Sequence, residues 1–197
     1  MSKRFFDITL SLLGIIALSP IFIIVSFIIL IAEGRPIFFK QIRVGRGGTL
    51  FTLYKYRTMR KNPQQNTQLA TSHDSRITKI GAFLRYYKID ELPQLLNVFI
   101  GNMSFVGYRP ELPYYVEKYT EKQKEILKYK PGIVDPATLY YSRLENDILD
   151  KSKNIELDYI QYILPKKLQL SLQYAKNANA FTDLKCIVCA IKSLFNH

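Results

Sequence analysis

The chain has 197 residues, 48% of them hydrophobic, and a formal net charge of +12. This length suits one main core, and the apolar content excludes a disordered chain. The charge is concentrated, because residues 34–89 carry twelve Lys or Arg and one acidic side chain, whereas residues 1–33 are neutral and residues 90–197 sum to +1. Such a field predicts an anionic partner: phosphates, acidic lipid headgroups or nucleic acid.

The first element is an uncharged apolar run over residues 8–32. About 20 apolar residues suffice to cross a bilayer. Ser19-Pro20 should kink the helix, because Pro removes a backbone hydrogen bond and clashes with the preceding turn. Basic residues flank both ends, so the positive-inside rule places both in the cytoplasm. Two interpretations stay open: a kinked helix that spans the membrane, or a bent, re-entrant helix that returns to the same side.

A β-hairpin is predicted next, with strands over residues 36–41 and 49–57 and a glycine-rich turn at 45–48. Alternation places Lys55 and Arg57 on one face of the second strand, so we expect them to project together. The turn lacks the spacing of a P-loop or a dinucleotide-binding fingerprint. A polar surface loop is predicted over residues 62–75, and a helix over 77–87.

Two adjacent acids, Asp90 and Glu91, follow the cationic region. Pro93 suits a first helical turn and Gly101 suits a helix end, so the acids lie at or just before a helix N-terminus. The partial positive charge there favours carboxylates and phosphate oxygens. Adjacent acids can divide the work of nucleophile and of metal ligand or base. The alternative is that both simply cap the helix.

The remaining chain is predicted to be mostly helical. We expect a turn that presents Arg109, an amphipathic helix with a solvated face over residues 112–129, and a break at 130–133. Residues 140–145 are expected to be extended or irregular, and 155–164 and 165–175 helical. Thr182 and Asp183 should open a last helix, in which Cys186 and Cys189 are interpreted as small buried apolar residues. The predicted class is α+β: a mainly helical single domain with a small β-hairpin.

Through an ordered set of motifs, the chain resembles a known family, the bacterial sugar transferases, and specifically the small monotopic phosphoglycosyl transferases. The resemblance runs from the N-terminal helix to about residue 143. Its motifs are Ser19-Pro20 followed by residues 53–59 (LYKYRTM), 74–78 (DSRIT), 81–85 (GAFLR), 89–95 (IDELPQL), 103–111 (MSFVGYRPE) and 130–133 (KPGI).

The resemblance implies an enzyme that transfers a phospho-sugar from a UDP-sugar to undecaprenyl phosphate and releases UMP, the first membrane step of a bacterial surface-glycan or glycoprotein pathway. It implies that Asp90 is the nucleophile, which forms a covalent phospho-sugar intermediate, and that Glu91 holds Mg²⁺. Without the family, each single arginine would be interpreted as a surface charge. The phosphate-binding positions that match are Lys55, Arg85, Arg109 and Arg143.

The resemblance also implies a membrane arrangement. Residues 1–34 would form a re-entrant membrane helix broken at Ser19 and Pro20, and residues 35–197 a catalytic domain on the cytoplasmic face of the bacterial inner membrane. Larger relatives carry an added multi-span N-terminal domain, and we expect the small monotopic form here. The expected partners are the UDP-sugar, undecaprenyl phosphate and membrane lipids, with no nucleic acid.

Two segments depart from the family pattern. Residues 134–139 (VDPATL) replace a common Gly-Trp-Ala-Gln-Val, and Leu170-Ser171 stands where many relatives have Leu-Asp. Both bear on sugar identity and C-terminal contacts rather than on the chemistry.

A competing hypothesis from another class is a membrane-anchored basic adaptor that binds acidic lipid or nucleic acid without catalysis. It explains the apolar run and the charge. It does not explain two acids beside the cationic stretch, or arginines spread over three segments.

Overall fold

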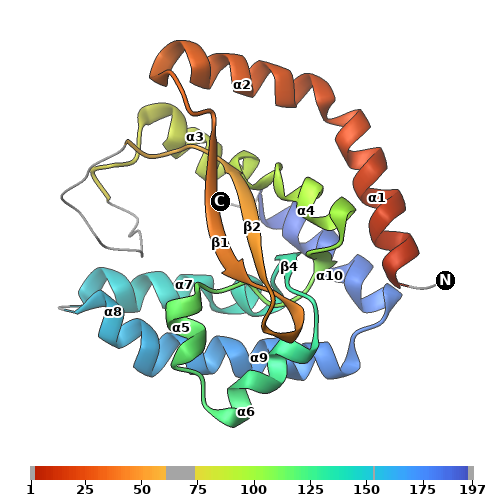
Figure 1. The fold of residues 1–197 in the computed structure, drawn as a ribbon. Coiled ribbons are helices and arrows are strands. Elements are labelled where there is room, and N and C mark those ends of the chain that lie inside the picture. The colour runs from red at the N-terminus through yellow and green to blue at the C-terminus, as the bar shows by residue number, and fades with distance from the viewer. Residues whose placement is uncertain (1–2, 61–73, 153, 195–197) are drawn as a thin grey trace.

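The computed structural model describes residues 3–60, 74–152 and 154–194, without the side chains of Ser142, Arg143 and Asn146. Most of the loop predicted over 62–75 therefore lies outside the described residues. The described chain forms one mainly helical domain with two small two-stranded sheets. The predicted class included the hairpin but not the second sheet. Figure 1 shows the hairpin standing in the middle, with helices around it.

Helices α1 (Lys3–Ala17) and α2 (Ser19–Glu33) meet at a bend of 59°. The bend falls at the predicted Ser19-Pro20 break, and Pro20 lies in the first turn of α2, where a missing N–H costs little. The two helices form an arch around one side of the domain (Figure 1). No single described helix is long and apolar enough to cross a membrane, whereas α1 and α2 meet the length and composition criteria as a bent pair.

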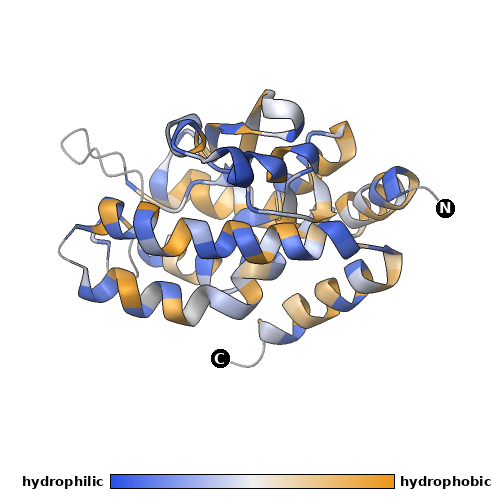
Figure 2. Cartoon of the chain, turned by 90° about the horizontal axis from the view of Figure 1, so that it is seen from below, coloured by the Kyte–Doolittle hydropathy of each residue, from blue (hydrophilic) through white to orange (hydrophobic). Residues whose placement is uncertain are grey.

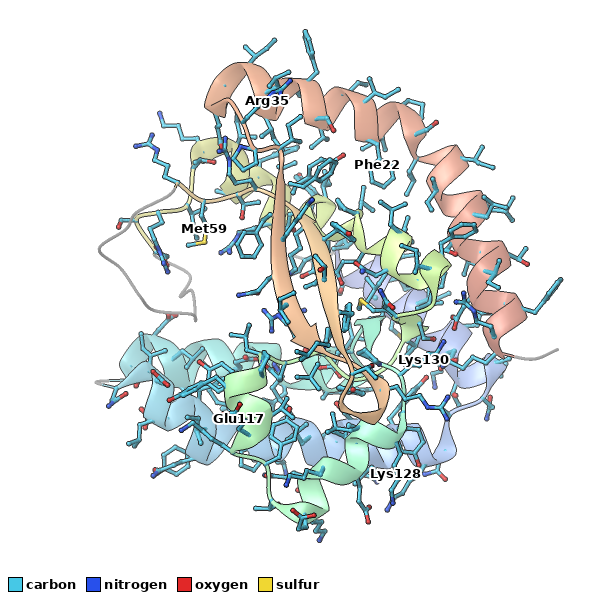
Figure 3. The ribbon with its side chains drawn as sticks, viewed as in Figure 1. Phe22, Arg35, Met59, Glu117, Lys128 and Lys130 are labelled. Carbon is cyan, nitrogen blue, oxygen red and sulfur yellow. The ribbon has the colours of Figure 1, made fainter. Side chains whose placement is uncertain are left out.

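The arch has two different faces. On its inner face, Val25 and Ile29 of α2 are buried in one cluster with Tyr56 and Leu84. Phe22 points from α2 toward the hairpin (Figure 3), and its ring lies 6.2 Å from that of Tyr56. The outer face of the arch is apolar and exposed, and large exposed apolar patches in proteins mark interaction or membrane surfaces. The exposed apolar side chains of the arch include Leu12, Leu13, Ile16, Ile21, Ile23, Ile24, Phe27, Ile28 and Ile31.

The predicted hairpin is confirmed. Strands β1 (Phe38–Val44) and β2 (Leu50–Tyr56) pair antiparallel, with Phe38 opposite Tyr56 and Val44 opposite Leu50. A short 3₁₀ turn, η1 (Arg46–Gly48), joins them, and Gly47 and Gly48 adopt the positive φ that the turn requires.

The expectation that Lys55 and Arg57 project together is wrong. Arg57 lies beyond the last residue of β2, and its Nη2 donates to the carbonyl oxygens of Glu33 and Gly34 at 2.7 and 2.8 Å. Those carbonyls end α2, where a cation offsets the partial negative charge of the helix terminus. Arg57 therefore ties α2 to the hairpin, and Lys55 serves a separate site.

Helix α3 (Lys79–Tyr86) begins at Thr78, whose side chain accepts a hydrogen bond from the Gly81 N–H. It is followed by the 3₁₀ turn η2 (Ile89–Glu91) and by α4 (Gln94–Ile100). Gly101 ends α4 with φ 106°. The structure thus confirms the predicted helix N-terminus beside the two acids.

A second sheet was not predicted. Strands β3 (Ser104–Val106) and β4 (Gly132–Val134) pair parallel, with Ser104 opposite Gly132. The backbones approach so closely that a Cβ on Gly132 would lie 2.1 Å from the Gly107 nitrogen. The sequence predicted only a break at 130–133, because each strand is too short to show a periodic pattern.

Two local predictions in the second half are wrong. Residues 112–129 form three short helices, α5 (Pro113–Glu117), α6 (Glu121–Lys124) and η3 (Glu125–Lys128), because Thr120 starts a new helix through a capping box with Gln123. This segment is not simply a solvated face, since Tyr115, Tyr119 and Ile126 are buried.

Residues 140–145, expected to be irregular, lie inside α7 (Pro136–Lys151). Asp135 caps this helix by accepting from the Ala137 N–H, and Pro136 occupies its first turn.

The C-terminal region is helical, as predicted. It comprises α8 (Ile155–Asp158), a π-helical turn η4 (Tyr159–Ile163), α9 (Leu164–Asn177) and α10 (Ala180–Ser193). Figure 2 shows apolar and polar residues alternating around α9, whose buried face joins the largest core cluster. Asn179 caps α10, with Thr182 completing the capping box. Cys186 is buried as expected, but Cys189 is exposed.

Candidate active site

The two acids lie in a short, sharply turned segment between α3 and α4. Lys88 adopts a left-handed conformation with φ 55°, which is uncommon for a residue with a side chain and redirects the chain into η2. Asp90 is buried, and Glu91 exposes only 14% of its side chain. Both carboxylates therefore face the domain rather than bulk water, which argues against two plain surface caps.

Glu91 accepts hydrogen bonds from two cationic side chains that come from distant parts of the chain. Its Oε1 accepts from Lys55 Nζ at 2.7 Å and from Arg109 Nη2 at 3.1 Å. Lys55 lies near the end of β2, and Arg109 follows β3. Three of the sequence-predicted positions, Lys55, Glu91 and Arg109, thus lie in contact, and Asp90 precedes Glu91 in the chain.

Arg109 reaches this position because of the close approach of β3 and β4. A Cβ on Gly107 would lie 2.4 Å from the Lys130 carbonyl oxygen, so the two segments pack backbone to backbone. The Gly132 N–H donates to the Tyr108 carbonyl at 2.9 Å, directly before Arg109. The GYRPE and KPGI segments therefore form one support for a single arginine.

The surroundings shift the pKa values of the two acids in opposite directions. Burial raises the pKa of Glu91, but the charges of Lys55 and Arg109 outweigh it and hold that pKa well below its usual range. Burial raises the pKa of Asp90, and Lys55 only partly opposes the shift. The Glu91 charge in turn raises the pKa of Arg109. Neighbouring acids with opposite shifts are typical of sites in which each has its own role.

Polar atoms without a partner mark the space beside the acids. Among the described residues, Asp90 Oδ1 and Gln94 Nε2 are buried and have no hydrogen-bond partner, and the same holds for Arg57 Nε, Tyr108 OH and Tyr119 OH outside this segment. Buried polar atoms in native proteins are nearly always paired, so such orphans indicate a place for a ligand, water or ion. Gln94 was not predicted as a site residue, although its position four residues after Asp90 could have identified it.

Arg85 is held to one side of this cluster. Its Nε donates to Thr58 Oγ1 at 3.0 Å, and its Nη2 contacts Met59 Sδ at 3.4 Å. Its charge is near enough to Asp90 to oppose the rise in that pKa. Arg143 lies in α7, but its side chain is outside the described part of the structure, so its predicted role stays a prediction.

A buried polar network holds Pro110 and Glu111, the two residues after Arg109, and it was not predicted from the sequence. Arg43 Nη1 donates to the Pro110 carbonyl at 2.9 Å and lies 3.6 Å from Glu111 Oε2. Tyr159 OH donates to Glu111 Oε1 at 2.5 Å. Tyr159 opens the π-helical turn, a local irregularity that often aims a side chain at a functional region.

The two segments that depart from the family pattern touch each other. Ser171 Oγ in α9 donates to Asp135 Oδ1 at 2.9 Å, and both residues are buried. They line a small cavity of about 10 Å³ together with Tyr108, Arg109 and Lys167. A cavity of that size holds about one water molecule. The departures therefore lie beside Arg109 and not on the acids.

The residues present fit a small divalent cation. The Lys55 and Arg109 bonds both go to Glu91 Oε1, which leaves Oε2 open in the described structure, and Asp90 Oδ1 is an orphaned acceptor. The described residues contain no group of three or more His, Cys, Asp or Glu that could hold a metal. Mg²⁺ is commonly held by one or two carboxylates, with substrate phosphates and water as the other ligands. Asp90 and Glu91 suit that mode.

Comparison with known proteins gives the class. The family model described as "Bacterial sugar transferase" matches residues 1–197. The chain is 36% identical to the "Uncharacterized sugar transferase EpsL" of Bacillus subtilis, over 98% of this chain and 86% of EpsL. It is 42% identical to a "Putative undecaprenyl-phosphate N-acetylgalactosaminyl 1-phosphate transferase" of the same organism, over 76% and 80% of the two chains.

The chain is also similar to longer proteins. It is 32% identical to a "UDP-glucose:undecaprenyl-phosphate glucose-1-phosphate transferase" of Escherichia coli, over 96% of this chain but only 39% of that protein. The chain belongs to the bacterial sugar transferase family, and it is an enzyme of the transferase class. This membership favours the enzyme over the non-catalytic adaptor.

The first prediction concerns the Lys55–Glu91 pair. Glu91→Gln leaves Lys55 and Arg109 close together without their shared anion, so chemical unfolding in detergent micelles should show a loss of about 1–3 kcal/mol. Combining Glu91→Gln with Lys55→Met should recover part of that loss, which gives a coupling of about 1–3 kcal/mol in the double-mutant cycle.

Lys40→Met is the matched control, because Lys40 lies on the same hairpin but is exposed. Its effect should stay below about 1 kcal/mol. A coupling near zero between Lys55 and Glu91 would show that the pair does not organise the site.

Proposed function

We propose that this enzyme transfers a phospho-sugar from a UDP-sugar to undecaprenyl phosphate and releases UMP, as a membrane step of a surface-polysaccharide pathway. The relatives named as undecaprenyl-phosphate transferases support this choice of substrates. The observation that carries the proposal is the difference between the contacts of the two acids. Glu91 is held by two cations, whereas Asp90 keeps a buried oxygen without a partner.

The proposed reaction has two steps at one phosphorus atom. An Asp90 carboxylate oxygen attacks the β-phosphorus of the UDP-sugar, and the bond from that phosphorus to the UMP oxygen breaks. UMP leaves with the electron pair, and an acyl phosphate joins Asp90 to the sugar phosphate. A phosphate oxygen of undecaprenyl phosphate then attacks the same phosphorus, restores the Asp90 carboxylate and forms the lipid diphosphate sugar.

A covalent intermediate suits the charges of this site. Direct transfer would require a donor diphosphate and a lipid phosphate to lie close together, where their negative charges repel strongly. In the two-step route UMP leaves before the lipid phosphate attacks, so one group of cations serves both phosphates in turn. Lys55 and Arg109 are already held at Glu91, and Arg85 and Arg143 would complete the set.

Mg²⁺ is the proposed cofactor, held by Glu91 with Asp90 beside it. When bound, it would neutralise phosphate charge and polarise the phosphoryl oxygens. The protein's own part is to keep Glu91 ionised through Lys55 and Arg109, so that the carboxylate is ready to bind a cation at neutral pH.

The proposed location is the cytoplasmic face of the bacterial inner membrane, with the arch of α1 and α2 inserted as a re-entrant helix. The exposed apolar side chains of the arch support insertion, and the 59° bend at Ser19-Pro20 supports a return to the same side. A lipid acceptor with a long chain also needs the site close to the bilayer. The division into a membrane helix over 1–34 and a catalytic domain over 35–197 follows from this arrangement.

Asp90→Asn tests the nucleophile. Wild-type enzyme mixed with a UDP-sugar alone should release UMP in one burst about equal to the enzyme, and mass spectrometry should find the sugar phosphate on the peptide with Asp90. Asp90→Asn should show neither, and should lose several orders of magnitude in turnover, as removal of a covalent nucleophile usually does. Near-normal turnover of Asp90→Asn, or an adduct on Glu91, would overturn the assignment.

Chelation tests the cation. Excess EDTA should abolish UMP release, and added Mg²⁺ should restore it, because the diphosphate charge is then neutralised at Glu91. Glu91→Gln should retain less than about 1% of the activity and require more Mg²⁺ for what remains. Lys40→Met serves again as the control and should keep the wild-type response. Full activity in EDTA would remove the metal from the proposed reaction.

A further inference from the structure

The first turns of α1 carry three charged side chains, Lys3, Arg4 and Asp7. In the sequence the two basic residues look like a cytoplasmic flank of the apolar run, and Asp7 has no evident role. In the structure, all three bind elements of the catalytic domain.

Lys3 joins the first helix to the last. Its Nζ donates to Asp183 Oδ2 of α10 at 2.6 Å and to the Val106 carbonyl of β3 at 3.2 Å. The Asp183 side chain is only 4% exposed and also accepts from Tyr174 OH at 2.8 Å. Asp183 is therefore a buried acceptor that depends on Lys3 for its counter-charge.

Arg4 caps the helix that follows the catalytic acids. Its Nη1 donates to the Val98 carbonyl at 2.7 Å, and its Nη2 to the Phe99 carbonyl at 2.8 Å. These carbonyls belong to the last turn of α4, which has no intrahelical donors for them and carries partial negative charge. Arg4 thus anchors α1 to α4 at the end away from Glu91.

Asp7 is the most deeply placed of the three, with 2% of its surface exposed. Its Oδ1 accepts from Ser104 Oγ at 3.0 Å and from the Phe105 N–H at 3.2 Å, both in β3. One turn further along α1, Ser11 is fully buried. This face of α1 therefore belongs to the interior of the domain, whereas Leu13 and Ile16 further along the helix are exposed.

A spanning orientation would break all of these contacts. The N-terminal end would have to leave the domain, which would leave the buried Asp183 without its counter-charge and the Ser104 hydroxyl without its acceptor. A buried carboxylate without its counter-charge is costly, and so is a carboxylate near the bilayer interior. The same contacts hold α4 and β3, which connect directly to Glu91 and Arg109.

We infer that polar docking of Lys3, Arg4 and Asp7 onto α10, α4 and β3 keeps both ends of the membrane helix on one side, and that the positive charge of the N-terminus does not do so by itself. This inference rests on the proposed re-entrant arrangement and names what enforces it. Lys3 and Asp7 are positioning residues, with Asp183 and Ser104 as their partners.

Exchanging the charges of Lys3 and Asp183 shows whether their contact or the positive charge of the N-terminus sets the topology. The reporter is Ser2→Cys in a chain with Cys186→Ala and Cys189→Ala, probed in intact cells with a membrane-impermeant maleimide. The reporter chain without further substitutions should not be labelled, because its N-terminus faces the cytoplasm. Lys3→Glu should raise labelling several-fold, because the introduced carboxylate repels that of Asp183. Lys3→Glu with Asp183→Lys should return labelling to the background, although its N-terminus carries the same charge as the single variant. Labelling of the double variant equal to that of the single would overturn the inference.

A second pair of variants leaves the N-terminal charge unchanged. Ser104 lies in β3 and not in the membrane helix, so Ser104→Ala removes a partner of Asp7 without changing that helix, and it should raise labelling. Thr9→Leu, at an exposed position of α1, makes the helix more apolar without touching the docking contacts and should not. The reverse result, labelling with Thr9→Leu but not with Ser104→Ala, would show that hydropathy alone sets the topology. Labelling of the unsubstituted reporter itself would instead contradict the re-entrant arrangement.

Discussion

The Glu91 carboxylate is the interaction on which the site depends. It accepts from Lys55 of β2 and from Arg109 after β3, so three segments far apart in the chain converge on one oxygen atom. Two cations this close repel each other, and only a buried anion between them holds them in place. The same two charges keep Glu91 ionised, whereas burial raises the pKa of its neighbour Asp90. Two adjacent acids thereby acquire different properties from their surroundings alone.

The rest of the fold supplies the positions of those three segments. The hairpin brings Lys55 against η2, and the contact of the Gly107 and Gly132 backbones fixes the turn that carries Arg109. Arg43, Glu111 and Tyr159 form a buried network that bonds the two residues after Arg109, Pro110 and Glu111. The arch encloses this arrangement: Arg57 ties the end of α2 to the hairpin, and the start of α1 is bonded to α4 and β3.

Much of the site could be predicted because its signals are local. Pro93 and Gly101 delimit α4 and so place Asp90 and Glu91 at a helix start, and Ser19-Pro20 marks the bend of the arch. The remaining features depend on contacts between segments distant in sequence. Alternation placed Lys55 and Arg57 on one face, but it could not show that Arg57 lies beyond the strand and binds α2. The β3–β4 pair is too short for a pattern, and the bonds of Lys3, Asp7 and Tyr159 join residues 48 to 180 positions apart. Thr120 split a predicted helix because a capping box outweighed the amphipathic periodicity.

The covalent role of Asp90 is tested most directly by the stereochemistry at phosphorus. A UDP-sugar whose β-phosphorus carries sulfur in one configuration would be converted with undecaprenyl phosphate, and the configuration of the lipid product would be determined. Each in-line displacement inverts the phosphorus centre. Attack by Asp90 followed by attack of the lipid phosphate comprises two displacements, so the configuration should be retained. Inversion would mean a single direct displacement and would contradict the role assigned to Asp90.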